Sequence, residues 1–353
     1  MLSYAHGVGD APLLGDTIGA ALARTVERFG DREALVACAQ QYRATWRQLS
    51  AESAKVARGL LALGLEPGDR VGIWAPNRYE WVVTQLACAR AGAILVNLNP
   101  AYQTAELEYA LRQSSTSVVV HARAFRSSDY AAMLAEVRPR LPALRLALCL
   151  DDDWQALAEH GRALAPDALA EREAALEADD PINIQYTSGT TGFPKGATLS
   201  HHNILNNGYF VGRALALTER DRLCIPVPFY HCFGMVMGNL ACVALGAAMI
   251  IPGEAFDAGR VLETIAAERC TALYGVPTMF IAELDHPRFS DFDLSSLRTG
   301  IMAGSPCPVE IMKQVLGRMH LGEMTICYGM TETSPVSTQS APDDPLELRT
   351  GSV

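Results

Sequence analysis

The chain has 353 residues, of which 49% are hydrophobic and 19% charged, so it can bury a large core and is not disordered, collagen-like or held by disulfides. Twenty-nine Lys and Arg against 39 Asp and Glu give a net charge of −10, which excludes a general attraction for DNA or RNA. A chain of this length has room for two domains of about 150 residues each.

Helices and strands are expected to alternate along the first half of the chain. Apolar residues recur at helical spacing in 18–29, and 46–63 predicts a second helix that ends at Gly64. The next expected strands are 70–75, 93–97, 117–121 and 144–150, and the helices between them are 79–91, 104–113 and 129–137. Residues 151–180 are acidic and weakly apolar, which predicts a surface helix and connector.

The second half repeats this rhythm. Strands are expected at 181–186, 222–226, 247–251, 271–274, 298–303 and 324–327, and helices at 202–215, 258–268 and 308–317. Strands separated by helices of about 10–15 residues imply parallel sheets covered on both faces. We therefore predict an α/β fold with two parallel-sheet subdomains side by side. The first would span 1–178 with its acidic connector, and the second 179–335.

Residues 233–251 form a long apolar run in which Asn239 is the only clearly polar residue. Hydropathy alone would allow this run to span a membrane. Three glycines interrupt this run, prolines lie just before it, and 247–251 is better explained as a short strand. We favour a buried helix and strand over a membrane-anchored protein, and we expect no stable membrane insertion.

The nine cysteines are scattered, and no two of them have the spacing of a zinc site or a redox pair. Most lie in apolar runs, so we expect free thiols in a reducing compartment. Residues 1–15 lack a basic start followed by an apolar core and predict no signal peptide. Together these features predict a cytoplasmic protein.

The most informative segment follows the expected strand at 182–186 and reads Tyr186-Thr-Ser-Gly-Thr-Thr-Gly-Phe-Pro-Lys-Gly196. Its glycines allow close backbone approach, its N–H groups and hydroxyls can surround phosphate oxygens, and Lys195 adds a mobile positive charge. Neither the Walker A pattern nor the dinucleotide-binding glycine pattern is present. A flexible loop that binds nothing is the alternative for a segment of this composition.

This segment resembles the phosphate-binding signature of the adenylate-forming superfamily, which includes acyl-CoA synthetases, luciferases and the adenylation domains of peptide synthetases. Residues 328–333, Tyr-Gly-Met-Thr-Glu-Thr, resemble the second core motif of that family, and residues 228–234, Pro-Phe-Tyr-His-Cys-Phe-Gly, resemble the third. The resemblance runs from about residue 18 to the last residue. It implies attack of a carboxylate on the α-phosphate of ATP with release of pyrophosphate, followed by transfer to CoA.

The resemblance also implies which residues bind ATP and its metal. Lys195, Thr331, Glu332 and His231 would be catalytic, with Glu332 and Thr190 holding Mg²⁺, a hard cation that prefers oxygen ligands. Singly, Tyr328 could be a core aromatic, Glu332 a helix cap and Thr331 a turn hydroxyl. The full ATP-binding set is Thr187, Ser188, Gly189, Thr190, Thr191, Gly192, Lys195, Gly304, Ser305, Tyr328, Gly329, Thr331 and Glu332.

The implied acyl pocket follows from the same motifs. Residues 233–240 carry no carboxylate to pair with an ammonium, which argues against an amino acid substrate. The apolar residues 235–237 and Leu240 suggest an adaptable wall, so a medium-chain or branched fatty acid is favoured over acetate or an aryl acid. His231 could also be a structural histidine, and 303–306 a simple turn. The proposed lining residues are His231, Phe233, Met235, Val276, Gly304, Gly329 and Met330.

The chain departs from the family pattern at its end. Family members continue into a β-barrel subdomain and a small mobile domain with a catalytic lysine, and none of those later motifs occurs before Val353. We expect residues 336–353 to begin the barrel and the chain to be a fragment that forms thioesters poorly. A non-catalytic nucleotide- or acyl-binding module is the alternative, a luciferase-like oxidation is a more remote one, and a homodimer is possible.

Overall fold

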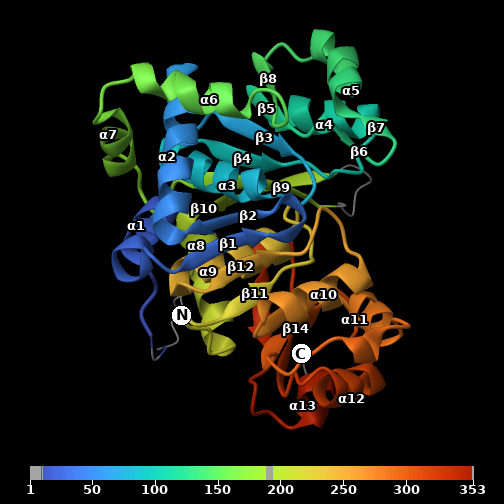
Figure 1. The fold of residues 1–353 in the computed structure, drawn as a ribbon. Coiled ribbons are helices and arrows are strands. Elements are labelled where there is room, and N and C mark those ends of the chain that lie inside the picture. The colour runs from blue at the N-terminus through green and yellow to red at the C-terminus, as the bar shows by residue number, and fades with distance from the viewer. Residues whose placement is uncertain (1–8, 10, 188–193, 352–353) are drawn as a thin grey trace, which may run out of the picture.

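The computed structural model describes residue 9, residues 11–187 and residues 194–351. Two large sheets lie one beyond the other, with helices on their faces (Figure 1). The smaller sheet has the order β10-β9-β4-β3-β5-β8, and the larger has the order β16-β15-β14-β13-β11-β12-β1-β2. The α/β fold with two parallel-sheet subdomains, as predicted from the sequence, is confirmed.

The smaller sheet is parallel except at one edge, where β10 runs antiparallel to β9. Its strands alternate along the chain with helices, as the sequence predicts. The strands are β3 (Arg70–Trp74), β4 (Ile94–Asn97), β5 (Val118–His121), β8 (Leu146–Cys149), β9 (Pro181–Thr187) and β10 (Lys195–Ser200), and a separate short hairpin joins β6 (Ala124–Phe125) and β7 (Ser128–Asp129).

The larger sheet has a parallel centre with an antiparallel strand at each edge, β2 beside β1 and β16 beside β15. The antiparallel edge strands end the parallel pairing on both sides. The strands are β1 (Glu33–Ala37), β2 (Tyr42–Thr45), β11 (Arg222–Cys224), β12 (Ala248–Ile251), β13 (Ala272–Gly275), β14 (Thr299–Ala303), β15 (Glu323–Gly329) and β16 (Val336–Gln339).

Each sheet takes strands from both sides of residue 178. The early strand β1 pairs with β12 of the larger sheet, with Leu35 opposite Met249. The late strand β9 pairs with β4 of the smaller sheet, with Asn183 opposite Leu95. The boundary predicted at residue 178 therefore does not separate the two sheets.

Helices cover the sheets. Those linked to the smaller sheet are α2 to α7, and α10 to α12 lie on the far side of the larger sheet (Figure 1). The helices are α1 (Ile18–Phe29), α2 (Trp46–Ala62), α3 (Tyr79–Ala91), α4 (Thr104–Gln113), α5 (Tyr130–Val137), α6 (Trp154–His160), α7 (Ala168–Ala174), α8 (His201–Ala214), α9 (Ala241–Leu245), α10 (Ala258–Glu268), α11 (Pro277–Leu284), α12 (Val309–Arg318) and α13 (Leu346–Gly351).

The apolar run at 233–251 is buried between other elements. It forms a π-helix, η4 (Phe233–Leu240), which continues into α9 and then β12, and every residue of η4 is buried. The predicted buried helix and strand are thus confirmed. Across residues 11–187 and 194–351, no helix combines the length and apolar character needed to cross a bilayer.

The last described residues extend the larger sheet. β16 pairs antiparallel with β15, with Tyr328 opposite Thr338, and α13 follows. The start of a β-barrel over 336–353 stays a prediction. In the described part of this segment, β16 is an edge strand of the larger sheet.

Candidate active site

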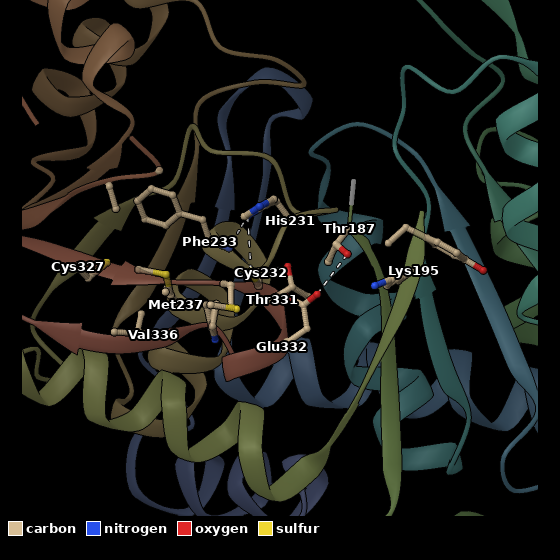
Figure 2. Close-up of a pocket in the computed structure, with 16 residues that line it drawn as sticks. Thr187, Lys195, His231, Cys232, Phe233, Met237, Cys327, Thr331, Glu332 and Val336 are labelled. Atoms are coloured by element: carbon tan, nitrogen blue, oxygen red, sulfur yellow. Dashed lines mark hydrogen bonds between the residues drawn. The ribbon is translucent and has the colours of Figure 1, made fainter. Parts of the chain in front are cut away.

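A cavity of about 620 Å³ lies at the carboxyl ends of strands from both sheets. Thr187 ends β9, Ala303 ends β14 and Gly329 ends β15, which is the edge where open parallel sheets usually place ligand sites. Figure 2 shows the side chains around it. The lining residues are Tyr186, Thr187, Lys195, His231, Cys232, Phe233, Met237, Ala303, Gly304, Cys327, Gly329, Met330, Thr331, Glu332, Pro335 and Val336.

The hairpin of β9 and β10 brings two predicted phosphate ligands to one face. Thr187 and Lys195 are directly opposite partners in the antiparallel ladder, so their side chains leave the same face of the hairpin. Both line the cavity, and Lys195 is exposed. The predicted residues Ser188, Gly189, Thr190, Thr191 and Gly192 lie between these two positions, outside the described residues.

The motif at 328–333 meets this hairpin directly. The Oγ1 of Thr187 donates a hydrogen bond to Oε1 of Glu332 at 3.3 Å, and Figure 2 shows this contact with Lys195 on the same side. Thr331 and Glu332 belong to a short 3₁₀ turn, η6 (Thr331–Thr333), just after β15. The structure therefore brings together two sequence motifs whose contacting residues are 145 positions apart in the chain.

The oxygen donors at this end of the cavity fit a magnesium ion that arrives with phosphates. Such an ion keeps several waters and needs only one or two protein carboxylates besides the phosphate oxygens. Glu332 offers an exposed carboxylate that lines the cavity beside Thr187 and Lys195. Within residues 11–187 and 194–351, no group of three or more His, Cys, Asp or Glu side chains is placed to hold a metal by itself.

His231 presents a neutral hydrogen-bond donor to the cavity. Its Nδ1 lies 3.2 Å from the N–H of Phe233, which can only donate, so Nδ1 accepts and Nε2 carries the proton. The ring is open to the cavity, but the surrounding protein removes water and lowers the pKa of the imidazole below its usual range. The residue can therefore bind an anionic oxygen without adding a full charge.

The opposite end of the cavity is apolar. Phe233 and Met237 come from η4 and are both buried, and Val336 comes from β16. Burial raises the pKa of the Cys232 thiol to about 11 and that of Cys327 to about 12, so both remain protonated at neutral pH and act as apolar wall. An apolar ligand segment would fit at this end.

Met235, predicted to line the acyl pocket, is not among the lining residues. Its sulfur instead accepts hydrogen bonds from the amides of Asn97 at 3.2 Å and Gln185 at 3.0 Å in the core. Phe233 and Met237 are four residues apart and share a helix face, whereas Met235 lies on the other side of η4. The spacing from Phe233 is the sequence signal that identifies Met237 rather than Met235 as a wall residue.

The other predicted residues lie at the rim or behind the wall. Gly304 lines the cavity with a φ of +93°, and a Cβ there would be 3.1 Å from Val276, which is not itself a lining residue. Tyr328 is 54% exposed and, like the exposed Ser305, is not a lining residue. Met330 is 47% exposed and does line the cavity.

Several lining residues were not singled out by the sequence patterns. Tyr186 and Cys232 are immediate neighbours of predicted residues, so adjacency was a usable signal for them. Pro335 and Val336 reach the cavity only because β16 folds back beside β15, which no local pattern indicates.

The family of this chain follows from comparison with known proteins. Residues 22–353 match the family model described as AMP-binding enzyme, and the chain belongs to that family. It is 45% identical over 357 residues to the putative acyl-CoA synthetase YngI of Bacillus subtilis (strain 168), covering 95% of this chain and 64% of that protein. It is 44% identical over 368 residues to the mitochondrial medium-chain acyl-CoA ligase ACSF2 of Danio rerio, covering 98% and 61%.

Solved structures agree with this assignment. The inhibitor-bound N-terminal domain of FACL13 from Mycobacterium tuberculosis is 27% identical with a TM-score of 0.80, and the match covers 95% of this chain and 81% of that domain. The anthranilate CoA ligase AuaEII in complex with anthranoyl-AMP is 26% identical with a TM-score of 0.84, over 95% and 63%. The chain spans less than two thirds of the length of the two curated relatives.

Proposed function

We propose that this protein activates a medium-chain or branched fatty acid with ATP and transfers the acyl group to CoA. A carboxylate oxygen attacks the α-phosphorus, the bond to the β-phosphate breaks, and pyrophosphate leaves with the electron pair. The CoA thiol then attacks the acyl carbonyl and AMP leaves. The observation that carries this proposal is the Thr187–Glu332 hydrogen bond, because it joins both phosphate-side motifs at one end of a cavity whose other end is apolar.

At the polar end, we assign Lys195 and Thr187 to the leaving phosphates and Thr331 to the α-phosphate. Glu332 would hold Mg²⁺, which neutralises phosphate charge and orients the pyrophosphate as a leaving group. Positive charge and fixed donors matter here because both reactants are anions. The remaining proposed ATP contacts are Ser188, Gly189, Thr190 (also to Mg²⁺), Thr191, Gly192, Gly304, Ser305, Tyr328 and Gly329.

At the apolar end, we assign the acyl chain to the wall made by Phe233, Met237 and Val336. His231 would hydrogen-bond the acid's carboxylate through Nε2 and keep it oriented for attack. The names of the medium-chain relatives and the cavity volume of about 620 Å³ support an acid of intermediate size. Gly304, Gly329 and Met330 remain proposed rim contacts, with Val276 behind them.

The compartment, the oligomeric state and the domain scheme stay predictions. The zebrafish relative is named as mitochondrial, whereas the sequence patterns of this chain predict a cytoplasmic location. A homodimer, and a β-barrel that begins within residues 336–353, stay predictions as well.

The test is exchange of labelled pyrophosphate into ATP, driven by a panel of carboxylic acids from acetate to long-chain acids. We expect exchange to peak with medium-chain or branched acids. Lys195→Ala and Glu332→Gln should lower it strongly, and Glu332→Gln should also raise the Mg²⁺ concentration needed. The matched controls Lys55→Ala and Glu27→Gln change exposed residues outside the cavity lining and should leave exchange unaltered.

Three results would decide between the alternatives. Exchange without acyl-CoA formation would support activation but not transfer by this chain. MgATP binding with no exchange for any acid would favour a non-catalytic binding module. Unchanged exchange in Lys195→Ala or Glu332→Gln would remove that residue from the mechanism.

A further inference from the structure

The two faces of the β9–β10 hairpin carry different side chains. Thr187 and Lys195 pair across the ladder and face the cavity, and the next pair inward is Tyr186 and Gly196. Because successive side chains in a strand point to opposite faces, the side chain of Tyr186 leaves the hairpin on the face opposite to that of Thr187, although Tyr186 is also one of the residues that border the cavity. A Cβ on Gly196 would lie 3.7 Å from the Tyr186 ring, so the ring covers this glycine.

Helix α4 is hydrogen-bonded to both sides of this hairpin. The hydroxyl of Tyr186 donates to the carbonyl of Ala110 at 2.7 Å, and the hydroxyl of Tyr109 donates to the carbonyl of Pro194 at 3.0 Å. The two tyrosine rings pack edge to face with centroids 6.5 Å apart. Helix α4 therefore holds both arms of the hairpin, one at Tyr186 next to Thr187 and the other at Pro194 next to Lys195.

The Tyr109 hydroxyl is itself oriented. The Nε2 group of Gln113, one turn further along α4, donates to the Tyr109 oxygen at 2.9 Å. This leaves the Tyr109 proton directed at Pro194, and consecutive hydrogen bonds of this kind strengthen one another. The helix that carries them is anchored in the core by Leu107 and Leu111.

Tyr109 is not among the residues that line the cavity, so its effect on a ligand must pass through the chain. The Pro194 carbonyl that it holds immediately precedes Lys195, the first residue of β10. This contact holds the start of β10 on α4, and the Tyr186 contact holds the end of β9 on the same helix, so the helix positions the end of the hairpin that carries Thr187 and Lys195.

We propose that Tyr109, oriented by Gln113, is a positioning residue that holds the start of β10 on α4 and so places Lys195 to grip a nucleoside triphosphate. This inference rests on the proposed function of the cavity. Since a neutral hydrogen bond contributes modestly to stability, we expect loss of the hydroxyl to weaken MgATP binding by about threefold to tenfold. The acyl end is built by η4 and β16, so the KM for the acid should not change.

The experiment compares wild type with Tyr109→Phe, which keeps the ring and its packing. The equilibrium Kd for MgATP is measured first, and KM for ATP and KM for the acid are measured in the exchange assay. Tyr102→Phe is the matched control, because this half-buried tyrosine makes no hydroxyl hydrogen bond within the described residues. Gln113→Leu removes only the orienting donor and should raise the Kd by about twofold.

The expected result is a higher Kd and KM for MgATP in Tyr109→Phe, with the KM for the acid and the values for Tyr102→Phe equal to wild type. Equal Kd values for wild type and Tyr109→Phe would overturn the inference and leave the proposed function standing. A parallel rise of both KM values would also overturn it, because it would indicate general loosening. Failure of wild type to bind MgATP would instead refute the proposed function itself.

Discussion

His201, the first residue of α8, is expected to control the acid stability of this protein. Its Nδ1 accepts the N–H of Ile18 at 3.2 Å, and its Nε2 has no partner among the described residues. Burial lowers the pKa of this imidazole from 6.5 to about 4, with the charge of Asp180 acting in the opposite direction. A neutral ring is therefore needed to hold the start of α1 against α8.

The size of the effect follows from the difference between the two pKa values. In the unfolded chain His201 takes up a proton near pH 6.5, whereas in the folded chain it stays neutral down to about pH 4. The unfolded state thus binds more protons in this window, and stability falls as the pH falls. At about 1.4 kcal/mol per pKa unit, the loss from this one residue is about 3 kcal/mol.

Urea unfolding of wild type and His201→Gln at pH values from 7.5 to 4.5 tests this reasoning. We expect the free energy of unfolding of wild type to fall more steeply between pH 6.5 and 4.5 than that of the variant. Ile204→Val is a matched control on the same helix, which should lower stability by about 1 kcal/mol at every pH without changing the slope. Parallel pH profiles for wild type and His201→Gln would refute the assignment.

Two further predictions concern single residues. Glu283 is buried, its Oε2 has no partner in the described part of the chain, and burial raises its pKa well above the usual range. The free energy of unfolding should therefore fall as the pH rises through that raised pKa, and Glu283→Gln should abolish this loss of stability. The measurement is the Tm of both proteins at pH 6 and pH 9. An equal loss of Tm at pH 9 in the variant would contradict the assignment. Gly329→Ala would place a Cβ 1.9 Å from a facing carbonyl oxygen, so it should displace the turn at 330–335 and reduce pyrophosphate exchange by tenfold or so. Gly317→Ala, where an added Cβ meets nothing within 4 Å, should leave exchange intact, and equal effects of the two changes would contradict a steric cause.

Local patterns were sufficient for most helices and parallel strands. The observed α4 and α10 have the predicted bounds, because their apolar spacing and the residues that flank them are local features. The hairpin of β1 and β2 was not predicted, and neither was its place beside β12. The pairing of Leu35 with Met249 joins residues more than 200 positions apart, and nothing in either segment alone specifies that partner.

The candidate site was predictable to the extent that its residues sit in continuous motifs. The strings around Thr187, His231 and Glu332 each carry several polar residues whose chemistry is evident, and the structure brings them to one cavity. The residues that form the wall of the apolar end were harder to predict from the sequence, because they depend on which face of η4 is turned toward the cavity. In an apolar helix that is buried on all sides, hydrophobicity alone does not distinguish the cavity face of Met237 from the core face of Met235. The four-residue spacing from Phe233 does so only once Phe233 is known to face the cavity.

The core position of Met235 explains how two sheets can form one site with fixed dimensions. Its sulfur accepts from Asn97 on β4 and from Gln185 on β9, and its carbonyl accepts from Gln85 on α3 at 3.2 Å. Gln185 is two residues before Thr187, so the strand that carries the polar end is bonded to the helix that carries the apolar end. Hydrogen bonds weaken steeply when their geometry changes, whereas the hydrophobic effect has no preferred direction. These contacts tie the strand of the polar end to the helix of the apolar end. Under the proposed function, they would keep an acid held at one end in register with a phosphate held at the other.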